Sequence, residues 1–137
     1  MSAFNDIPAA LTSAYRAGGF FTDAQTSYPN SSFSKPGPNV EWASLFNLPA
    51  TASTDAINGR DEYAGIFQID LNYPLDSGAG GPQAKADAIR AVFRRGAAFV
   101  SGGQRVEIVS TSIAQGVPVE GWYRVPVSVS YRAFVVR

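Results

Sequence analysis

The sequence predicts an α+β fold, a single domain over residues 1–137 with a largely antiparallel β-sheet and two helices packed on its apolar face. Apolar residues recur at three- and four-residue spacing in residues 6–17 and 82–95, which predicts two amphipathic helices. Strict alternation of apolar and polar residues in 63–73 and 122–136 predicts strands. The order of these segments, a helix followed by strands and then the same again, favours a sheet with helices on one face.

The first half of the chain contains one clear helix and less regular segments. Asp6 can cap the first helix, and Gly18-Gly19 ends it, with Ile7, Leu11, Ala14 and Tyr15 on its inner face. Residues 20–27 and 39–48 predict two strands, the second ended by Pro49. The prolines and glycine of residues 28–38 predict irregular structure between them, and the small, polar residues 50–62 predict a further irregular stretch.

The second half is more regular. The strand at 63–73 turns one polar side outward, so Asp70 is expected to be exposed. Residues 76–81 predict a loop, after which Pro82 opens the second helix. Ile89, Val92 and Phe93 form its inner stripe, and Arg94 and Arg95 lie in its last turn, ended by Gly96.

Four further segments follow that helix. Residues 97–100 and 105–113 predict two strands joined by a turn at Gly102-Gly103, and residues 115–121 are turn-rich. The last strand is Trp122 to Val136. Because Pro126 has no backbone donor, we expect it at a sheet edge or a bulge.

The composition excludes most common kinds of catalytic site. The chain has no Cys and no His, which removes thiolate nucleophiles, imidazole bases and the usual zinc and non-haem iron sites. Lysine occurs only at Lys35 and Lys85, which leaves few candidates for Schiff-base chemistry. Asp61, Glu62 and Asp70 are the best carboxylates for an acid–base pair or a metal site. Neighbours on a strand point to opposite faces, so solvated charges are the simpler interpretation, and no cofactor is expected.

The glycine-rich loop before the second helix does not complete a nucleotide-binding motif. A Walker loop needs Gly-Lys-Ser/Thr at the helix start, where this chain has Pro82-Gln83-Ala84. A dinucleotide fingerprint needs a third glycine or alanine, where this chain has Gln83. The loop is therefore expected to be a flexible crossover.

Charge and hydropathy point to assembly rather than to nucleic-acid or membrane binding. The chain has 11 basic and 11 acidic residues, and only 16% of its residues are charged. A neutral chain gives no reason to expect a broad phosphate-binding face, and a weakly charged surface does little to keep copies apart. No apolar run approaches a membrane span, and residues 1–6 lack a signal-peptide pattern, so we expect a protein kept in a cytoplasm.

Nine of the eleven basic residues are arginine. The planar guanidinium suits fixed pairing with carboxylates across interfaces, although each arginine could equally have an intramolecular partner. Trp122 is expected opposite the apolar face of its strand, as an interface anchor, whereas Trp42, Phe46, Phe67, Phe93 and Tyr131 are expected in the core. The candidate subunit or tube interface residues are Arg60, Asp61, Glu62, Arg90, Arg94, Arg95, Trp122, Arg124 and Arg132.

Three stretches, in this order and spacing, resemble the phage tail terminator-like family: GIFQIDLNYP (65–74), ADAIRAVFRRG (86–96) and GWYRVPVSVSY (121–131). YPNSSFSKP (28–36) and NVEWASLFNL (39–48) resemble looser blocks of the same family. Residues 18–27 and 50–62 have no match in that pattern.

The resemblance implies a structural virion protein that caps the tail tube of a bacteriophage. Its subunits would form a hexameric ring on the tube, stop polymerisation and contact the head connector, while DNA passes through the lumen without specific binding. The implied partners are other copies of the chain, the tail-tube protein and the head connector or stopper protein, with no membrane and no catalytic site. The implied location is the head-proximal end of the virion's tail, and the host cytoplasm during assembly.

Other interpretations stay open at this stage. The chain could be another neck or tail component, such as a head–tail joining or tail-tube subunit. A carboxylate- or metal-dependent enzyme using Asp61, Glu62 or Asp70 is a further alternative, as is a small module that binds a peptide or partner strand. In the ring interpretation, residues 50–62 are expected to be mobile in an isolated subunit and ordered on assembly.

Overall fold

A computed structural model describes residues 3–50, 53–55 and 59–136. Its helices and strands, in chain order, are α1 (Ala3–Gly18), a 3₁₀ turn (Asp23–Gln25), β1 (Thr26–Ser27), β2 (Trp42–Pro49), β3 (Ser53–Asp55), β4 (Arg60–Pro74), α2 (Gly80–Val92), β5 (Ala98–Ser101), β6 (Gln104–Ile113), β7 (Val117–Val119) and β8 (Trp122–Val136).

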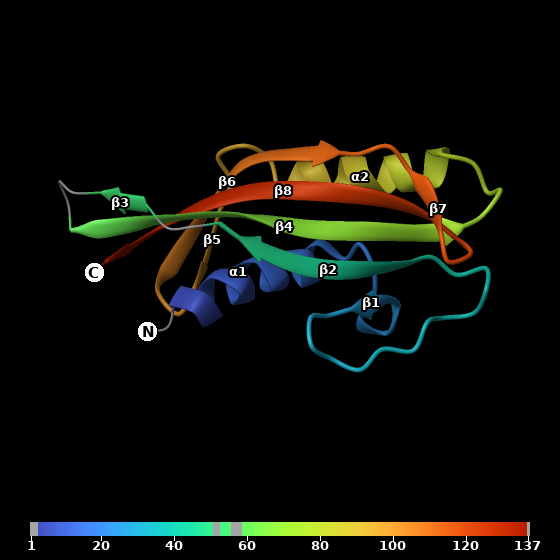
Figure 1. Cartoon of the computed structure of the whole chain (residues 1–137), viewed down its shortest axis with the longest axis horizontal. Coiled ribbons are helices and arrows are strands. Elements are labelled where there is room, and N and C mark those ends of the chain that lie inside the picture. Colours follow the sequence, from blue (N-terminus) through green and yellow to red (C-terminus); the bar gives the residue numbers. More distant parts are fainter. Residues whose placement is uncertain (1–2, 51–52, 56–58, 137) are drawn as a thin grey trace.

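The described strands form one sheet in the order β1-β2-β4-β8-β6-β5, with β3 on β4 and β7 on β8 (Figure 1). All pairs are antiparallel except β1 with β2. β4 and β8 are 15 residues each and pair along their whole length, from Arg60 opposite Val136 to Pro74 opposite Trp122. The predicted α+β class, with its largely antiparallel sheet, is confirmed.

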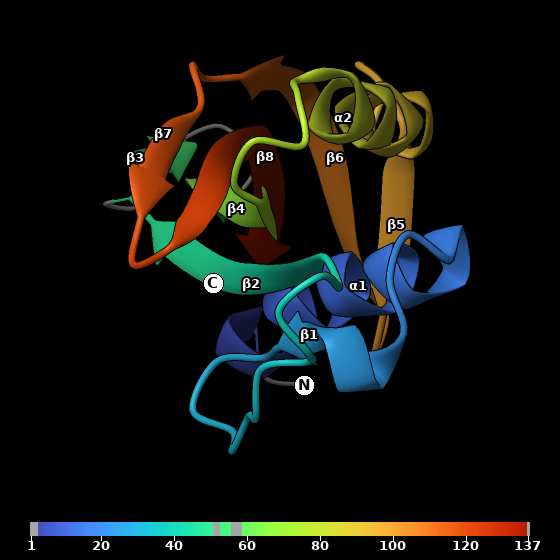
Figure 2. The same cartoon turned by 90° about the vertical axis from the view of Figure 1, so that its right-hand side faces the viewer.

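Both helices pack on one face of the curled sheet and share its core (Figure 2). From α1, Leu11 and Tyr15 are fully buried, and from α2 Ile89 is fully buried. They meet the alternate residues of the two long strands that the sequence predicts to be apolar. That sheet contribution consists of Phe67, Ile69 and Leu71 of β4 with Val125, Val127, Val129, Tyr131 and Ala133 of β8.

α1 is longer at its start than predicted. It begins at Ala3, so Asp6 lies in the first turn instead of capping the helix, and Pro8 lies inside it. The ring of Phe4 packs edge-on against Tyr63 of β4, with 5.7 Å between ring centroids. This contact with a distant strand stabilises a turn that local sequence signals do not predict. The predicted inner face is correct, since all four of its residues are buried.

Three segments contain different structure from that predicted. Residues 20–27 form a 3₁₀ turn and the two-residue β1, not a full strand. Residues 50–62 are not entirely irregular, because β3 pairs with the start of β4: Ser53 lies opposite Glu62, and Asp55 lies opposite Arg60. Residues 51–52 and 56–58 of that stretch lie outside the described residues. The turn-rich segment 115–121 contains β7, which pairs with β8.

α2 ends three residues before its predicted end. It runs from Gly80 to Val92, and Arg94 and Arg95 lie beyond it. Phe93 leaves the helical conformation with φ −95° and ψ 50°. Its ring is fully buried between Phe67 and Phe99, at centroid distances of 5.9 and 5.4 Å. Burial of this ring is the tertiary reason why the helix ends there.

Pro126 lies at a gap in the pairing of one side of β8. β8 is a central strand between β4 and β6, so the edge alternative is wrong. On the side away from β4, pairing with β6 ends at Ile113–Val127 and pairing with β7 begins at Val117–Arg124, and Pro126 lies between them. The Pro126 carbonyl accepts a hydrogen bond from the Ala114 N–H at 2.9 Å. The missing donor therefore falls where pairing is already interrupted.

Two burial predictions are wrong. Asp70 is only 6% exposed, and Gln68 donates a hydrogen bond to its carboxylate at 2.8 Å. Phe46, expected in the core, is 44% exposed. Asp70 lies near the end of β4, where Trp42 and its aromatic neighbours cover the sheet face without helices. Phe46 lies on this same face opposite Gln68, four residues further along β2 than Trp42.

Candidate subunit interface

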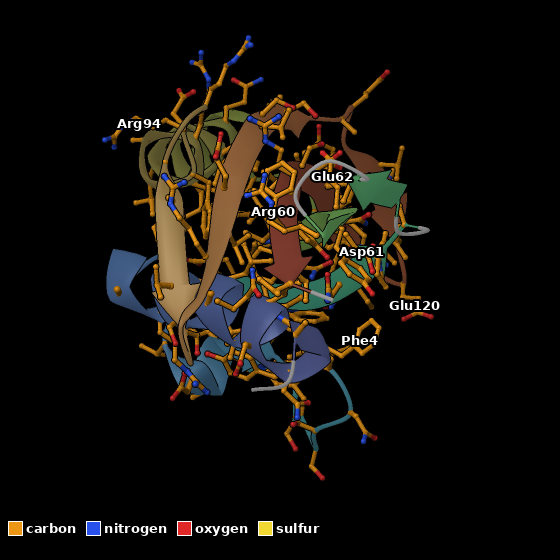
Figure 3. The ribbon with its side chains drawn as sticks, turned by 90° about the vertical axis from the view of Figure 1, so that its left-hand side faces the viewer. Phe4, Arg60, Asp61, Glu62, Arg94 and Glu120 are labelled. Atoms are coloured by element: carbon orange, nitrogen blue, oxygen red, sulfur yellow. The ribbon has the colours of Figure 1, made fainter. Side chains whose placement is uncertain are left out.

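The structure separates the nine candidate interface residues into three places. Arg60, Asp61, Glu62 and Arg132 lie where β4 begins and β8 ends (Figure 3). Trp122 and Arg124 lie at the opposite end of β8. The third group comprises Arg90 on α2 with Arg94 and Arg95 just after it.

The first group is largely paired within the chain. Arg132 donates to Glu107 at 3.0 Å, and Arg105 lies 3.5 Å from the same carboxylate. The guanidinium of Arg60 stacks 4.7 Å from the ring centroid of Phe134. A hollow of about 180 Å³ lies among these side chains. Because Arg60 and Arg132 have these contacts, the alternative of intramolecular partners holds for them.

The group at the start of β8 is also internally paired. Arg124 Nε donates to Asn72 Oδ1 at 2.9 Å, and the Asn72 side chain is fully buried. Trp122 is only 9% exposed and packs edge-on against Trp42, with 5.9 Å between ring centroids. Its ring therefore helps to close the sheet face that the helices leave uncovered, and the role of Trp122 as an interface anchor stays a prediction.

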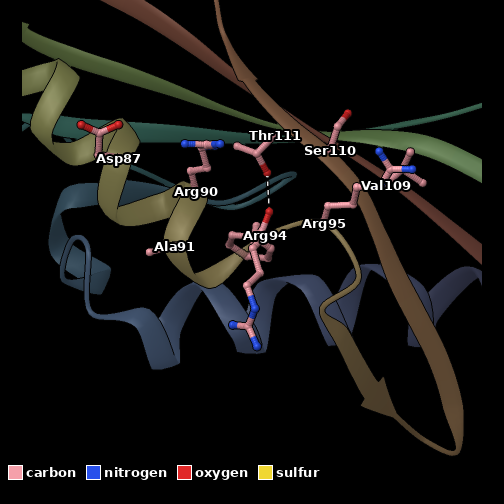
Figure 4. Close-up of a pocket in the computed structure, with 9 residues that line it drawn as sticks. Asp87, Arg90, Ala91, Arg94, Arg95, Val109, Ser110 and Thr111 are labelled. Atoms are coloured by element: carbon pink, nitrogen blue, oxygen red, sulfur yellow. Dashed lines mark hydrogen bonds between the residues drawn. The ribbon is translucent and has the colours of Figure 1, made fainter.

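Arg90, Arg94 and Arg95 differ from all of these. Each is exposed, and within residues 3–50, 53–55 and 59–136 none of the three side chains has a hydrogen bond or an ion pair. Figure 4 shows them around a hollow of about 600 Å³ between α2 and β6, which Val109, Ser110 and Thr111 also line. Uncompensated guanidinium groups at one edge of a groove are typical of a surface that binds carboxylates of a partner.

The groove exists because β6 lacks a second strand neighbour along half its length. β5 pairs only with Gln104–Glu107, and the Ile108 N–H donates to the Ala97 carbonyl at 2.8 Å just beyond. No described strand pairs with this edge of β6 from Val109 to Ile113. Thr111 Oγ1 donates to the Phe93 carbonyl at 2.6 Å and joins the end of α2 to β6.

Apolar side chains lie along the same edge. A register shift between Ile108 and Ser110 sets Val109 out of the regular ladder, where it is 43% exposed. Ile113 is 48% exposed and lines a second hollow of about 480 Å³, which shares Asp87, Arg90 and Thr111 with the first. Together these two hollows form what we name the α2–β6 groove: an unpaired strand edge, exposed apolar side chains and three arginines. Such a combination is typical of protein docking surfaces.

The carboxylates considered for catalysis are not brought together. Asp70 is eight positions beyond Glu62 on the same strand, about 26 Å at the usual rise per residue. In the described part of the chain no group of three or more acidic residues could hold a metal ion. In that same part, no helix has the length and apolar character needed to cross a bilayer.

Comparison with known proteins assigns the family. The family model described as phage tail terminator protein matches residues 6–131, which is nearly the whole chain. The chain belongs to the phage tail terminator family. Its members are structural proteins of bacteriophage tails, so this chain is a component of the virion's tail, and the resemblance drawn from residues 65–74, 86–96 and 121–131 is confirmed.

A solved structure supports the fold of this tail terminator. It superposes with a TM-score of 0.70 at 24% sequence identity, covering 93% of this chain and 92% of the other. This likeness shows the fold alone. No curated protein sequence shows significant similarity to the chain.

The groove was missed by sequence reasoning, although its arginines were not. All three arginines lie within the block 86–96 that carries the family resemblance, whereas Val109 and Ile113 lie in an ordinary strand pattern. What makes that strand a docking edge is the absence of a neighbour beyond Glu107. The early turn at Gly102-Gly103 is the sequence signal that β5 is short.

Proposed function

We propose that this tail terminator caps the bacteriophage tail tube as a hexameric ring, terminates tube polymerisation and forms the interface to the head connector. The family match over residues 6–131 is the observation that carries the proposal. In this role the chain acts through its shape and has no catalytic function. It assembles in the host cytoplasm and remains at the head-proximal end of the tail.

Two features of the structure support a ring subunit. A subunit in a closed ring needs two unlike surfaces, because each copy contacts its two neighbours differently. The α2–β6 groove is one surface with unsatisfied binding capacity (Figure 4). The chain is also neutral overall, with 11 charges of each sign, which suits a lumen through which DNA slides without specific binding.

Deletion of the gene from the phage tests the proposal. We expect tails of irregular, excessive length without heads, seen by electron microscopy, and normal tails when the wild-type gene is supplied in trans. Infectious particles with normal tails in the absence of the protein would contradict the role.

A purified sample separates this proposal from a tail-tube subunit. A tube protein polymerises into open tubes, whereas a terminator stops at one ring. We expect the protein to bind one end of isolated tubes and to prevent their further growth. Growth of tubes from the purified chain itself would favour the tail-tube alternative.

A further inference from the structure

The three arginines of the α2–β6 groove lie far from one end of the sheet. The backbone N–H of Gly96, just after Arg94 and Arg95, donates to the carbonyl of Ile108. Ile108 pairs with Tyr131 of β8, which in turn pairs with Gly65 of β4, so this part of the chain lies beside the Gly65 position of the sheet. The opposite end of β4 is Pro74. The nine positions between Gly65 and Pro74 correspond to about 30 Å along the strand. The arginine end of the α2–β6 groove is therefore far from the end where β4 stops.

At that other end, acidic residues project from three loops. Trp42 pairs with Asn72 and Trp122 pairs with Pro74, so residue 41, the loop after β4 and the turn before β8 all lie there. The carboxylates of this acidic end belong to Asp76 and Glu120, which are exposed, and to Glu41, which is half-buried. Within the described chain the carboxylates of Glu41 and Asp76 have no hydrogen bond or ion pair, and Glu120 has only Lys35, 3.9 Å away.

The acidic end also exposes apolar side chains. Val40 is 39% exposed, Leu75 44% and Val117 48%. This end thus combines three carboxylates with exposed apolar groups, beside the basic residues Lys35 and Arg124. The α2–β6 groove combines three guanidinium groups and the carboxylate of Asp87 with exposed Val109 and Ile113. The two surfaces therefore have net charges of opposite sign and are alike in apolar content.

We propose that the acidic end of one copy docks on the α2–β6 groove of the next copy, with Glu41, Asp76 and Glu120 facing Arg90, Arg94 and Arg95. Because the two surfaces are unlike and lie far apart, the contact is head-to-tail. An open chain of copies therefore has one free surface of each kind, at its two ends, until a ring closes. The inference rests on the proposed ring function and names the surfaces that form it.

Charge reversal on each surface tests the contact. One variant carries Arg90→Glu, Arg94→Glu and Arg95→Glu, and the other carries Glu41→Lys, Asp76→Lys and Glu120→Lys. Alone, each variant places like charges in the contact, so self-association, measured by sedimentation velocity in solution or on isolated tail tubes, should weaken about tenfold or more. In an equal mixture every contact can join unlike variants with opposite charges, so assembly should return as an alternating ring.

The control carries Arg16→Glu and Arg105→Glu, two exposed arginines that line neither surface, and should assemble like the wild type. Thermal unfolding of each variant checks that it is folded. Unchanged assembly of the arginine variant alone, or failure of the mixture while the control assembles, overturns this contact. A wild type that forms rings in a phage whose tails are normal without it contradicts the terminator role and leaves the contact standing.

Discussion

At the scale of single residues, Gly65 shows how closely two strands and a side chain meet in this fold. A Cβ atom added there would lie 2.5 Å from the Tyr131 hydroxyl and 2.9 Å from the Leu48 carbonyl. The Tyr131 hydroxyl is itself held by a 2.8 Å hydrogen bond to Asn47 Oδ1. Neither neighbour can move without breaking a contact, so only glycine fits.

We therefore expect Gly65→Ala to lower the free energy of unfolding by about 1–3 kcal/mol, the usual cost of overpacking. Urea denaturation monitored by fluorescence measures it. Gly80→Ala is the control, because nothing lies within 4 Å of the added Cβ and its φ is not positive. Equal stability of the two variants would show that the Gly65 site can relax.

At the scale of elements, the joint between α2 and β6 positions the arginines of the groove. Phe93 anchors it through burial, and Thr111 Oγ1 donates to the Phe93 carbonyl at 2.6 Å. This hydrogen bond satisfies a carbonyl that the end of the helix leaves without an intrahelical partner. The direction of Arg94 and Arg95 thus depends on one side chain of a neighbouring strand.

Thr111→Val, which keeps the shape and removes the hydroxyl, should lower the free energy of unfolding by about 1 kcal/mol. Amide hydrogen exchange at residues 90–95 should become faster, because the end of α2 opens more often. Ser112→Ala, at an exposed neighbouring position, should leave both quantities unchanged. Unaltered exchange at 90–95 in the Thr111 variant would show that Phe93 alone holds the joint.

At the scale of the whole molecule, tyrosines with raised pKa values make stability depend on pH in the alkaline range. The chain has no histidine to titrate near neutral pH. Burial, reinforced by the nearby Glu41 charge, raises the pKa of Tyr73 to about 12. Burial likewise raises the pKa of Tyr15 and of Tyr131 above 10.0. The folded state therefore holds these protons more tightly than the unfolded chain.

The sign follows from linkage. Stability from these tyrosines is fully present below pH 10, the unfolded value, and declines as the pH rises toward 12. Urea midpoints measured across this range should fall, and Tyr73→Phe should make the fall less steep. An identical pH dependence in wild type and variant would exclude Tyr73 as a source of the loss.

The sequence by itself determined the elements whose signal is local. Period-two alternation predicted the two long strands, and glycine and proline predicted the turns around them. The missing Cys and His residues predicted the exclusion of common catalytic sites, and the three family blocks predicted the family that residues 6–131 confirm. The strand, turn and family signals depend on residues close together in the chain, and the exclusion of catalytic sites depends on composition alone.

Only the tertiary structure decided which charged and aromatic residues are available to a partner. Trp122 and Arg90 are equally plausible interface residues in the sequence, yet Trp42 covers the first and nothing in the described chain pairs with the second. Asp70 has a polar pattern around it and is nevertheless buried. Burial and pairing depend on which distant segments meet, and that follows from strand order, where β6 extends past the end of β5.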